Sequence, residues 1–319
     1  MRLVSRLLLS LTLVALGTQR SVFAESSSGS AGEATVVYHS AASEVRLVLF
    51  ATDEHNRTIE NLQKDDFAVI DNETVIRDFR SFTRSPEMKL DLIVLIDSSE
   101  SVVPRIQKQM TVFLQSLAQW PMSPDMSPDD SLSVISFGGA GVRTLCDGNC
   151  PAALTPQRIA SVPKGGATPL FDAIETAIDL VTQHKQRDRW PAIILLSDGR
   201  DTISRASFGE ASERIVAGET QIYAIDLSPA GRRENGTAIL NKLAEVTGGR
   251  YIRSGDMLNV DFHQLMKKIS EDIHSAIVVS YAMPDSMAGF HSVRVLPSRH
   301  LAWKFRCRQG YFNRSTSQY

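Results

Sequence analysis

Four apolar runs of strand length recur through the middle of the chain. The clearest is Leu90–Ile96, which is apolar at every position except Asp91. An almost unbroken apolar run of this length is typical of a strand that is buried on both faces of a parallel sheet. The other three runs are Leu132–Phe137, Pro191–Leu196 and Ile222–Ile225.

Amphipathic segments with helical spacing lie between and after these runs. They are Val102–Trp120, Leu170–His184, Glu210–Ala217, Thr237–Val246 and Phe262–His274. Strands and helices that alternate at this pitch predict a doubly wound, mostly parallel sheet with helices on both faces. We therefore expect a Rossmann-like α/β domain over residues 88–274.

Shorter segments with strand-like alternation flank this domain on both sides. They are Val45–Phe50, Phe67–Ile70 and Val75–Phe82 before it, and Ala276–Ala282, His291–Leu296 and Leu301–Cys307 after it. Turn-forming residues separate them. Because each flank has too few strands for a stable sandwich of its own, we expect residues 34–87 and 275–313 to pair. The α/β domain would then be inserted into a small antiparallel β-sandwich.

The first 24 residues have the pattern of an export signal. Arg2 and Arg6 precede the apolar stretch Leu7–Leu16, and Val22-Phe23-Ala24 then provides small residues at the positions that a signal peptidase reads. A ten-residue apolar core is short for a membrane span, although an uncleaved anchor is the alternative. We expect an exported protein, secreted or periplasmic, with no membrane span after signal removal. A polar linker would cover residues 25–33 and a short tail residues 314–319.

Composition and charge argue against two classes of partner. The chain has 319 residues, of which 43% are hydrophobic and 22% charged, and its formal net charge is −2. Removal of the signal leaves 31 basic residues against 36 acidic ones. Since there is no basic excess, neither nucleic acid nor an anionic membrane is expected as a partner.

The three cysteines fit an oxidising compartment in part. Cys146 and Cys150 flank a turn-forming Asp-Gly-Asn triplet, which favours a small disulfide loop. Half of a zinc site is the alternative, but no second pair of soft ligands is evident nearby. Cys307 would remain without a partner.

Oxygen-bearing side chains follow two of the predicted strands and one glycine-rich loop. Asp97, Ser99 and Ser101 come directly after the first strand, and Asp198 ends another. Thr168 follows Gly165-Gly166 just before a predicted helix. Because the carboxyl ends of parallel strands meet at one crevice, these five residues can form a single site. Hard oxygen ligands of mixed charge suit Mg²⁺, with Mn²⁺ or Ca²⁺ as alternatives.

Individual members of this set have simpler interpretations. Either aspartate could cap a following helix. Thr168 could be the N-cap of a helix with Pro169 at its first position. Asp201 and Thr202 could extend the rim of the site or belong to a solvated loop.

The five positions together carry a family resemblance. Asp97-x-Ser99-x-Ser101, Thr168 in its glycine-rich loop and Ser-Asp-Gly at Asp198 resemble the metal-ion-dependent adhesion site of von Willebrand factor type A domains. The resemblance covers about residues 88–274. It implies that the serines and the threonine coordinate the metal directly or nearly so, and that the acids often act through water.

The flanks resemble a narrower group. Asn61–Phe67 and Arg306–Tyr311 are similar to segments on either side of the A domain in a secreted von Willebrand factor A-related family that is abundant in acidobacteria. This implies a bacterial protein with the same arrangement of domains. Cys307 departs from that pattern, in which a small or aliphatic residue is expected.

A metal with an open coordination position predicts a binding or adhesion module, not an enzyme. The expected partner is a protein that presents an Asp or Glu carboxylate to the metal. A metal-assisted hydrolase of phosphate esters is the rival hypothesis. Aspartyl-phosphate enzymes generally need a second Asp two residues after the first, where this chain has Ser99, and no general base is visible. A purely structural metal is the third interpretation.

Overall fold

The computed structural model describes residues 44–313, with gaps at 60, 85–88, 104–110, 116, 118–126, 128, 149, 185–188, 229–234, 254–261, 285–287 and 299–301. The expected signal peptide, linker and C-terminal tail therefore lie outside the described residues. Within the described part, every helix is too short or too polar to cross a membrane.

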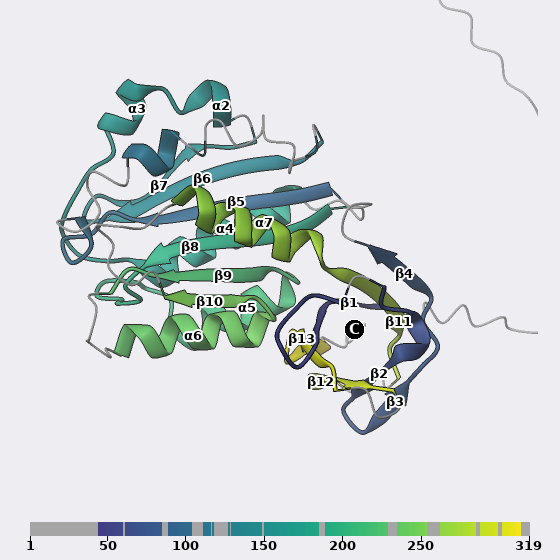
Figure 1. The fold of residues 1–319 in the computed structure, drawn as a ribbon. Coiled ribbons are helices and arrows are strands. Elements are labelled where there is room, and N and C mark those ends of the chain that lie inside the picture. The colour runs from purple at the N-terminus through teal and green to yellow at the C-terminus, as the bar shows by residue number, and fades with distance from the viewer. Residues whose placement is uncertain are drawn as a thin grey trace, which may run out of the picture. The chain divides into compact units, whose positions relative to one another are not determined.

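A six-stranded sheet forms the centre of the α/β domain (Figure 1). Its strands, in spatial order, are β10 (Arg250–Arg253), β9 (Gln221–Asp226), β8 (Arg189–Ser197), β5 (Lys89–Asp97), β6 (Ser131–Gly138) and β7 (Gly141–Cys146). All neighbouring pairs are parallel except β6 and β7. The expected mostly parallel α/β fold is confirmed.

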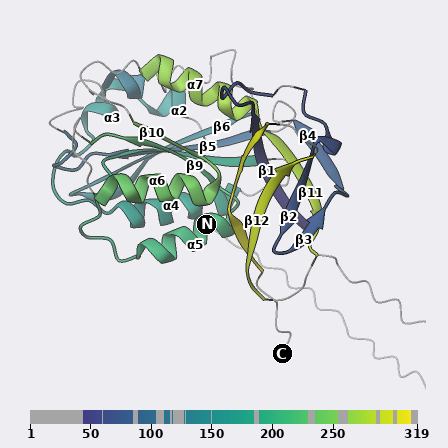
Figure 2. The ribbon, with the colours of Figure 1, turned by 60° about the horizontal axis from the view of Figure 1, so that its bottom comes forward.

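Helices cover both faces of this sheet (Figure 2). The helices on one face are α4 (Leu170–His184), α5 (Phe208–Ala217) and α6 (Asn235–Thr247), and those on the other are α2 (Cys150–Ala153), α3 (Pro156–Ala160) and α7 (Phe262–His274). Alternate residues of β5 enter the two resulting cores, with Ile93 and Leu95 in one and Leu92 and Val94 in the other. Burial on both faces explains why this strand is apolar almost throughout.

Several element boundaries differ from those expected. The helix α5 begins two residues early because the Ser207 hydroxyl and the Glu210 carboxylate form a capping box at its start. The sequence reading missed β7 and β10, which are short edge strands with exposed residues and no long apolar run. Much of the helix expected at Val102–Trp120 lies outside the described residues, and residues 111–115 are helical.

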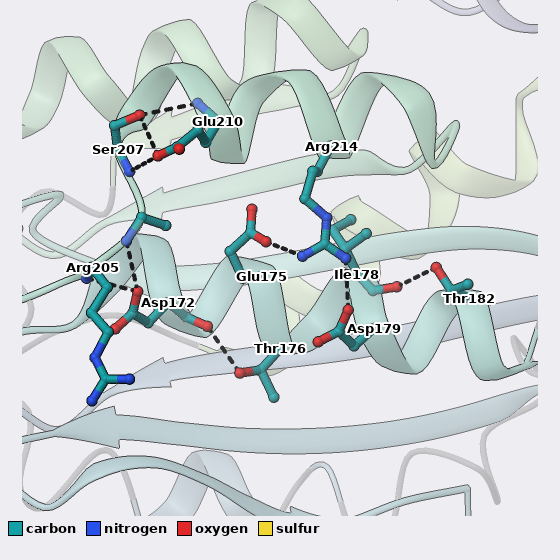
Figure 3. A network of polar contacts seen from close by, with 11 residues as sticks. Asp172, Glu175, Thr176, Ile178, Asp179, Thr182, Arg205, Ser207, Glu210 and Arg214 are labelled. Atoms are coloured by element: carbon teal, nitrogen blue, oxygen red, sulfur yellow. Dashed lines mark hydrogen bonds and ion pairs between the residues drawn. The ribbon is translucent and has the colours of Figure 1, made fainter. Parts of the chain in front are cut away.

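A network of charges joins α4 to α5 and to the segment that precedes α5 (Figure 3). The Arg214 guanidinium of α5 contacts the carboxylates of Glu175 and Asp179 on α4, the latter at 2.6 Å. On the same helix, Asp172 accepts hydrogen bonds from the backbone N–H groups of Arg205 and Ala206, both at 3.0 Å. These contacts hold the segment between β8 and α5 against α4.

Two antiparallel four-stranded sheets make up the remainder of the described chain. The first contains β13 (Lys304–Cys307), β1 (Glu44–Thr52), β11 (Ile277–Ala282) and β4 (Ser81–Arg84). The second contains β14 (Gly310–Asn313), β12 (Gly289–Pro297), β2 (Phe67–Asp71) and β3 (Thr74–Ile76), and the 3-10 helix η1 (Lys64–Asp66) precedes β2. In both sheets, strands from before the α/β domain pair with strands from after it.

The prediction of a single strand at Val75–Phe82 is wrong. The structure divides this stretch into β3, which pairs with β2, and β4, which pairs with β11 in the other sheet. A tight turn at Asn72, whose φ is 51°, folds β3 back on β2. The chain then crosses from the second sheet to the first, where it forms β4, and a period-two pattern cannot reveal this crossing.

The cysteines divide into one pair and one free thiol. Cys146 and Cys150 form a disulfide. Cys307 is free and half-buried on β13, and burial raises the pKa of its thiol to about 12. The thiolate is therefore scarce at neutral pH, which makes Cys307 a poor nucleophile.

A buried polar cluster joins the two sheets of the sandwich. Asp71 on β2 accepts hydrogen bonds from the hydroxyls of Tyr281 at 2.9 Å and Tyr311 at 2.8 Å. Tyr281 belongs to the opposite sheet. The His291 ring stacks on Tyr311 and lies 3.4 Å from the Asp71 carboxylate. One carboxylate therefore connects strands from both ends of the chain.

We expect Asp71→Ala to destabilise the protein by about 3 kcal/mol, because two buried hydroxyls would lose a charged acceptor. Urea unfolding of the wild type and the variant measures this difference. Asp78→Ala, at an exposed position a few residues away, is the control and should change little. Equal stability of the two variants would show that the cluster does not hold the sheets together.

Candidate metal centre

Asp97 lies at the carboxyl end of β5 and is fully buried. One carboxylate oxygen accepts the backbone N–H of Ser99 at 2.9 Å, and the other accepts the Ser197 hydroxyl at 2.6 Å. Ser197 is the last residue of β8, the strand next to β5. Sequence reasoning gave Ser197 no role, although it directly precedes Asp198. These bonds fix the orientation of the Asp97 carboxylate.

The two serines after Asp97 present their hydroxyls together. The Oγ atoms of Ser99 and Ser101 lie 3.2 Å apart. Ser99 is buried and Ser101 is half-buried. The Ser99 carbonyl also accepts the N–H of Val103 at 3.0 Å, which begins the next turn of the chain. The loop is thus held by its own backbone with both hydroxyls on one side.

The loop that carries Thr168 (the threonine loop) is hydrogen-bonded to the loop that carries Ser99 and Ser101 (the serine loop). The Gly165 N–H donates to the Ser98 carbonyl at 2.7 Å, and the Glu100 N–H donates to the Gly166 carbonyl at 3.0 Å. Thr168 itself is buried, and Thr202 holds its backbone on both sides at 2.7 and 2.9 Å. Because these bonds use the backbone of Thr168, its hydroxyl is available to a ligand.

Glycines at two positions allow the backbones of neighbouring loops to approach one another this closely. Gly166 has a φ of 75°, and a Cβ atom placed on it would lie 2.5 Å from the Cα of Gly139. Gly199, also at 75°, would bring a Cβ to 2.2 Å from the Gly236 carbonyl at the start of α6. Larger residues at these positions would push the loops apart. The sequence reading named the glycines at 165–166 but missed Gly139, whose signal is the Gly138-Gly139 pair at the end of β6.

Asp198 completes the set directly after β8. Its side chain is buried, and its Oδ1 accepts the N–H of Arg200 at 3.2 Å. Its charge is close enough to raise the pKa of Asp97. The structure therefore brings together the loops that carry the five predicted residues, at the edge where parallel strands end.

Asp201 and Thr202 have a structural role that differs from both expectations, the rim of the site and a solvated loop. Asp201 accepts the backbone N–H of Leu170 at 2.9 Å and so caps α4 from a distant loop. Thr168 is therefore not the N-cap of this helix. Since Thr202 holds the backbone of Thr168, the loop after β8 positions both the threonine and the helix behind it.

The donor set fits a hard divalent cation. It contains two carboxylates and three hydroxyls, all oxygen donors, as Mg²⁺ prefers. Among the described residues, no group of three or more His, Cys, Asp and Glu side chains could hold a metal. Soft sites of the zinc type are thus not found in this part of the chain.

Residues 91–268 match the family model of the von Willebrand factor type A domain. The chain belongs to the von Willebrand factor type A domain family. The six-stranded sheet and its helices are therefore the A domain.

Two curated relatives match shorter parts of the chain. It is 32% identical over 90 residues to the magnesium-chelatase 60 kDa subunit of Rhodobacter capsulatus, which covers 28% of this chain and 16% of that protein. It is 31% identical over 75 residues to the subunit of the same name from Cereibacter sphaeroides, which covers 24% and 13%. The chain thus spans about a sixth or less of the length of these relatives.

Several solved structures are similar to part of this chain. Proximal thread matrix protein 1 of the mussel byssus has a TM-score of 0.46 and 17% identity, over 58% of this chain and 48% of that chain. It has also been solved with a zinc-occupied MIDAS motif. Manganese-loaded TRAP protein of Plasmodium vivax has a TM-score of 0.44 and 17% identity, over 72% and 97%. Likenesses this distant say nothing about function.

Burial raises the pKa of Asp97 to about 6, while the hydrogen bonds from Ser197 and Ser99 lower it and the charge of Asp198 raises it further. Removal of a carboxylate from water disfavours its ionised form. A cation in the A domain would supply the missing counter-charge, but it must compete with this proton.

The same pKa predicts a pH dependence of stability in EDTA. The Asp97 carboxyl binds its proton more tightly in the folded protein than in the unfolded one, where its pKa is about 3.9. Its contribution to stability is therefore full below pH 4 and is lost as the pH rises through 6. We expect the stability of Asp97→Asn relative to wild type to increase by roughly 2–3 kcal/mol between pH 4 and 7.

Denaturant unfolding at a series of pH values in EDTA measures this change. Asp78→Asn, at an exposed site, is the control and should show a difference that does not depend on pH. A constant difference for Asp97→Asn as well would contradict the assigned effect of burial.

Proposed function

We propose that this protein is a binding module whose A domain holds a divalent cation and thereby engages an acidic group of a protein partner. The observation that carries the proposal is the convergence of the Asp97–Ser101, Thr168 and Asp198 loops, which share backbone hydrogen bonds. The contacts that hold Asp97 and Thr168 leave the Thr168 hydroxyl available for coordination.

Five residues would hold the cation. The serine and threonine hydroxyls would contribute neutral oxygen donors, and Asp97 and Asp198 would contribute negative charge, directly or through water. When bound, the ion would act as a Lewis acid that accepts a carboxylate oxygen from the partner. Mg²⁺ is the ion that this donor set favours, with Mn²⁺ and Ca²⁺ as alternatives.

The residues around the site support binding and not catalysis. Ser99 stands where an aspartyl-phosphate hydrolase would place its acid–base carboxylate. Its hydroxyl already contacts that of Ser101. Glu100 and Ile203 on the same edge are exposed, so a partner could reach them, and Ile203 is 52% exposed. One exposed apolar residue beside a cation suits a protein surface that presents an Asp or Glu next to an apolar residue.

The test of this function uses the protein from residue 25 onward. We expect added Mg²⁺ to raise its melting temperature, by the equivalent of about 2.7 kcal/mol at a hundred times Kd. Thr168→Ala should weaken the binding of Mg²⁺ at least about tenfold, because the substitution removes one ligand of the ion. Thr144→Ala, at an exposed position on β7, should bind Mg²⁺ as the wild type does.

A displayed peptide library then tests the partner class. Peptides that bind in Mg²⁺ should contain Asp or Glu, should lose binding when that residue becomes Asn or Gln, and should be released by EDTA. Binding that persists in EDTA, or that Thr168→Ala leaves unchanged at a Mg²⁺ concentration near the wild-type Kd, would reject the metal-dependent mechanism. Mg²⁺ binding without any acidic peptide would indicate a structural ion.

We propose further that the protein is exported and belongs with the secreted bacterial group that its flanks resemble. The Cys146–Cys150 disulfide supports an oxidising compartment. Expression of the full chain in a bacterial host should yield a mature protein that begins near Glu25 outside the cytoplasm. Mass spectrometry of the cell fractions measures this, and an unprocessed cytoplasmic chain would reject the proposal.

A further inference from the structure

A pocket lies at the opposite end of β8 from the candidate metal centre. It is formed where β1 of the sandwich and Arg308 meet the first residues of β8 and β9. It contains about 330 Å³ of empty space, including its opening to solvent. Its lining residues are Arg46, Val48, Trp190, Pro191, Glu219, Gln221, Thr247 and Arg308.

Three lining side chains have a buried polar atom without a hydrogen-bond partner among the described residues. These atoms are the indole Nε1 of Trp190, Nε of Arg308 and Oε1 of Gln221. Trp190 and Gln221 are each 2% exposed, and Arg308 is 7% exposed. More than nine in ten buried polar groups are normally paired, so three such groups among the lining residues of one pocket indicate a ligand or water bound there.

The charge of the pocket indicates the sign of that partner. Arg46 and Arg308 contribute two positive charges, and Glu219 contributes one negative charge. One terminal nitrogen of Arg308 donates to the Arg46 carbonyl at 2.7 Å and lies 3.5 Å from the Glu219 carboxylate. Arg308 is therefore held in place, while its Nε–H and the Trp190 N–H remain as unpaired donors. Two donors in a net positive pocket favour an anionic oxygen ligand.

The backbone at Glu219 is held in an unusual conformation beside the pocket. Its φ is 56°, and the other described non-glycine residues with positive φ are Asn56 and Asn72. Asparagine adopts this region readily, whereas a glutamate there is strained. The Glu219 N–H donates to the Val216 carbonyl at 3.2 Å, which ties the turn to the end of α5. Backbone strain of this kind clusters at binding sites.

We propose that this pocket binds a small carboxylate, of the size of formate or acetate. Its oxygens would accept the N–H groups of Trp190 and Arg308, and a bound water would donate to Oε1 of Gln221. Because the pocket is lined by both the sandwich and the A domain, its ligand would stabilise their contact. The pocket shares no residue with the metal centre, so this proposal does not depend on the proposed function.

The experiment replaces sodium chloride by sodium acetate at constant ionic strength. EDTA is present throughout, so that no carboxylate can bind through a cation at the metal centre. We expect a saturable rise in the melting temperature of the wild type and a matching isotherm by calorimetry. Trp190→Phe, which removes the indole N–H and keeps the aromatic ring, should weaken acetate binding about tenfold.

Trp303→Phe is the matched control, because Trp303 packs against the core of the sandwich, away from the pocket. It should bind acetate as the wild type does. Arg308→Lys keeps the charge but loses the Nε–H, and it should also bind more weakly. If Trp190→Phe does not fold, Arg308→Lys decides the question. No saturable response, or an equal response in both pocket variants and the control, would overturn the proposal and leave a pocket that holds only water.

Discussion

The parallel pairing of β5 with β8 is the constraint on which the candidate metal centre depends. Its register places Ile96 beside Leu196, so the next residues of the two strands, Asp97 and Ser197, emerge at the same edge. Their side chains then meet in a 2.6 Å hydrogen bond. This bond joins residues a hundred positions apart and orients the carboxylate toward the two serines that follow it. A slip of one residue in the pairing would reverse which side chains face each core.

Close backbone contact between loops is the second requirement. The serine loop, the threonine loop and the loop after β6 touch one another through N–H and carbonyl groups. Such contact is possible only where no Cβ intervenes, as at Gly139 and Gly166. The polar side chains of the site are therefore positioned by rigid backbone on three sides. Preorganisation of this kind lowers the entropy cost of holding a ligand.

The sandwich and the A domain are connected by more than the two chain crossings. Arg306 on β13 contacts the Asp272 carboxylate of α7 at 2.5 Å, and its guanidinium lies 3.8 Å from the centre of the Phe50 ring. Asp272 also accepts the Tyr223 hydroxyl from β9. With the pocket around Arg308, these contacts form a polar junction in which buried charges are paired. A junction of this type gives a specific arrangement of the two parts at little net gain in stability.

The sequence alone determined the α/β architecture and the residue types of the candidate metal centre. Apolar periodicity is a local property, so it placed α4 and α7 at their observed bounds and located the central strands. The five oxygen-bearing residues were found because strand ends meet at one edge in any doubly wound sheet.

Only the tertiary structure decided the contacts between distant segments. Asp201 caps α4, Ser197 orients Asp97, and Val75–Phe82 divides between two sheets, and none of these follows from local propensity. The pocket proposed to bind a small carboxylate is lined by Arg308 and Trp190. These residues are 118 positions apart and meet because the sandwich packs against the A domain. Pattern along a chain shows what each segment prefers, whereas burial and hydrogen bonding between segments are decided by which surfaces finally meet.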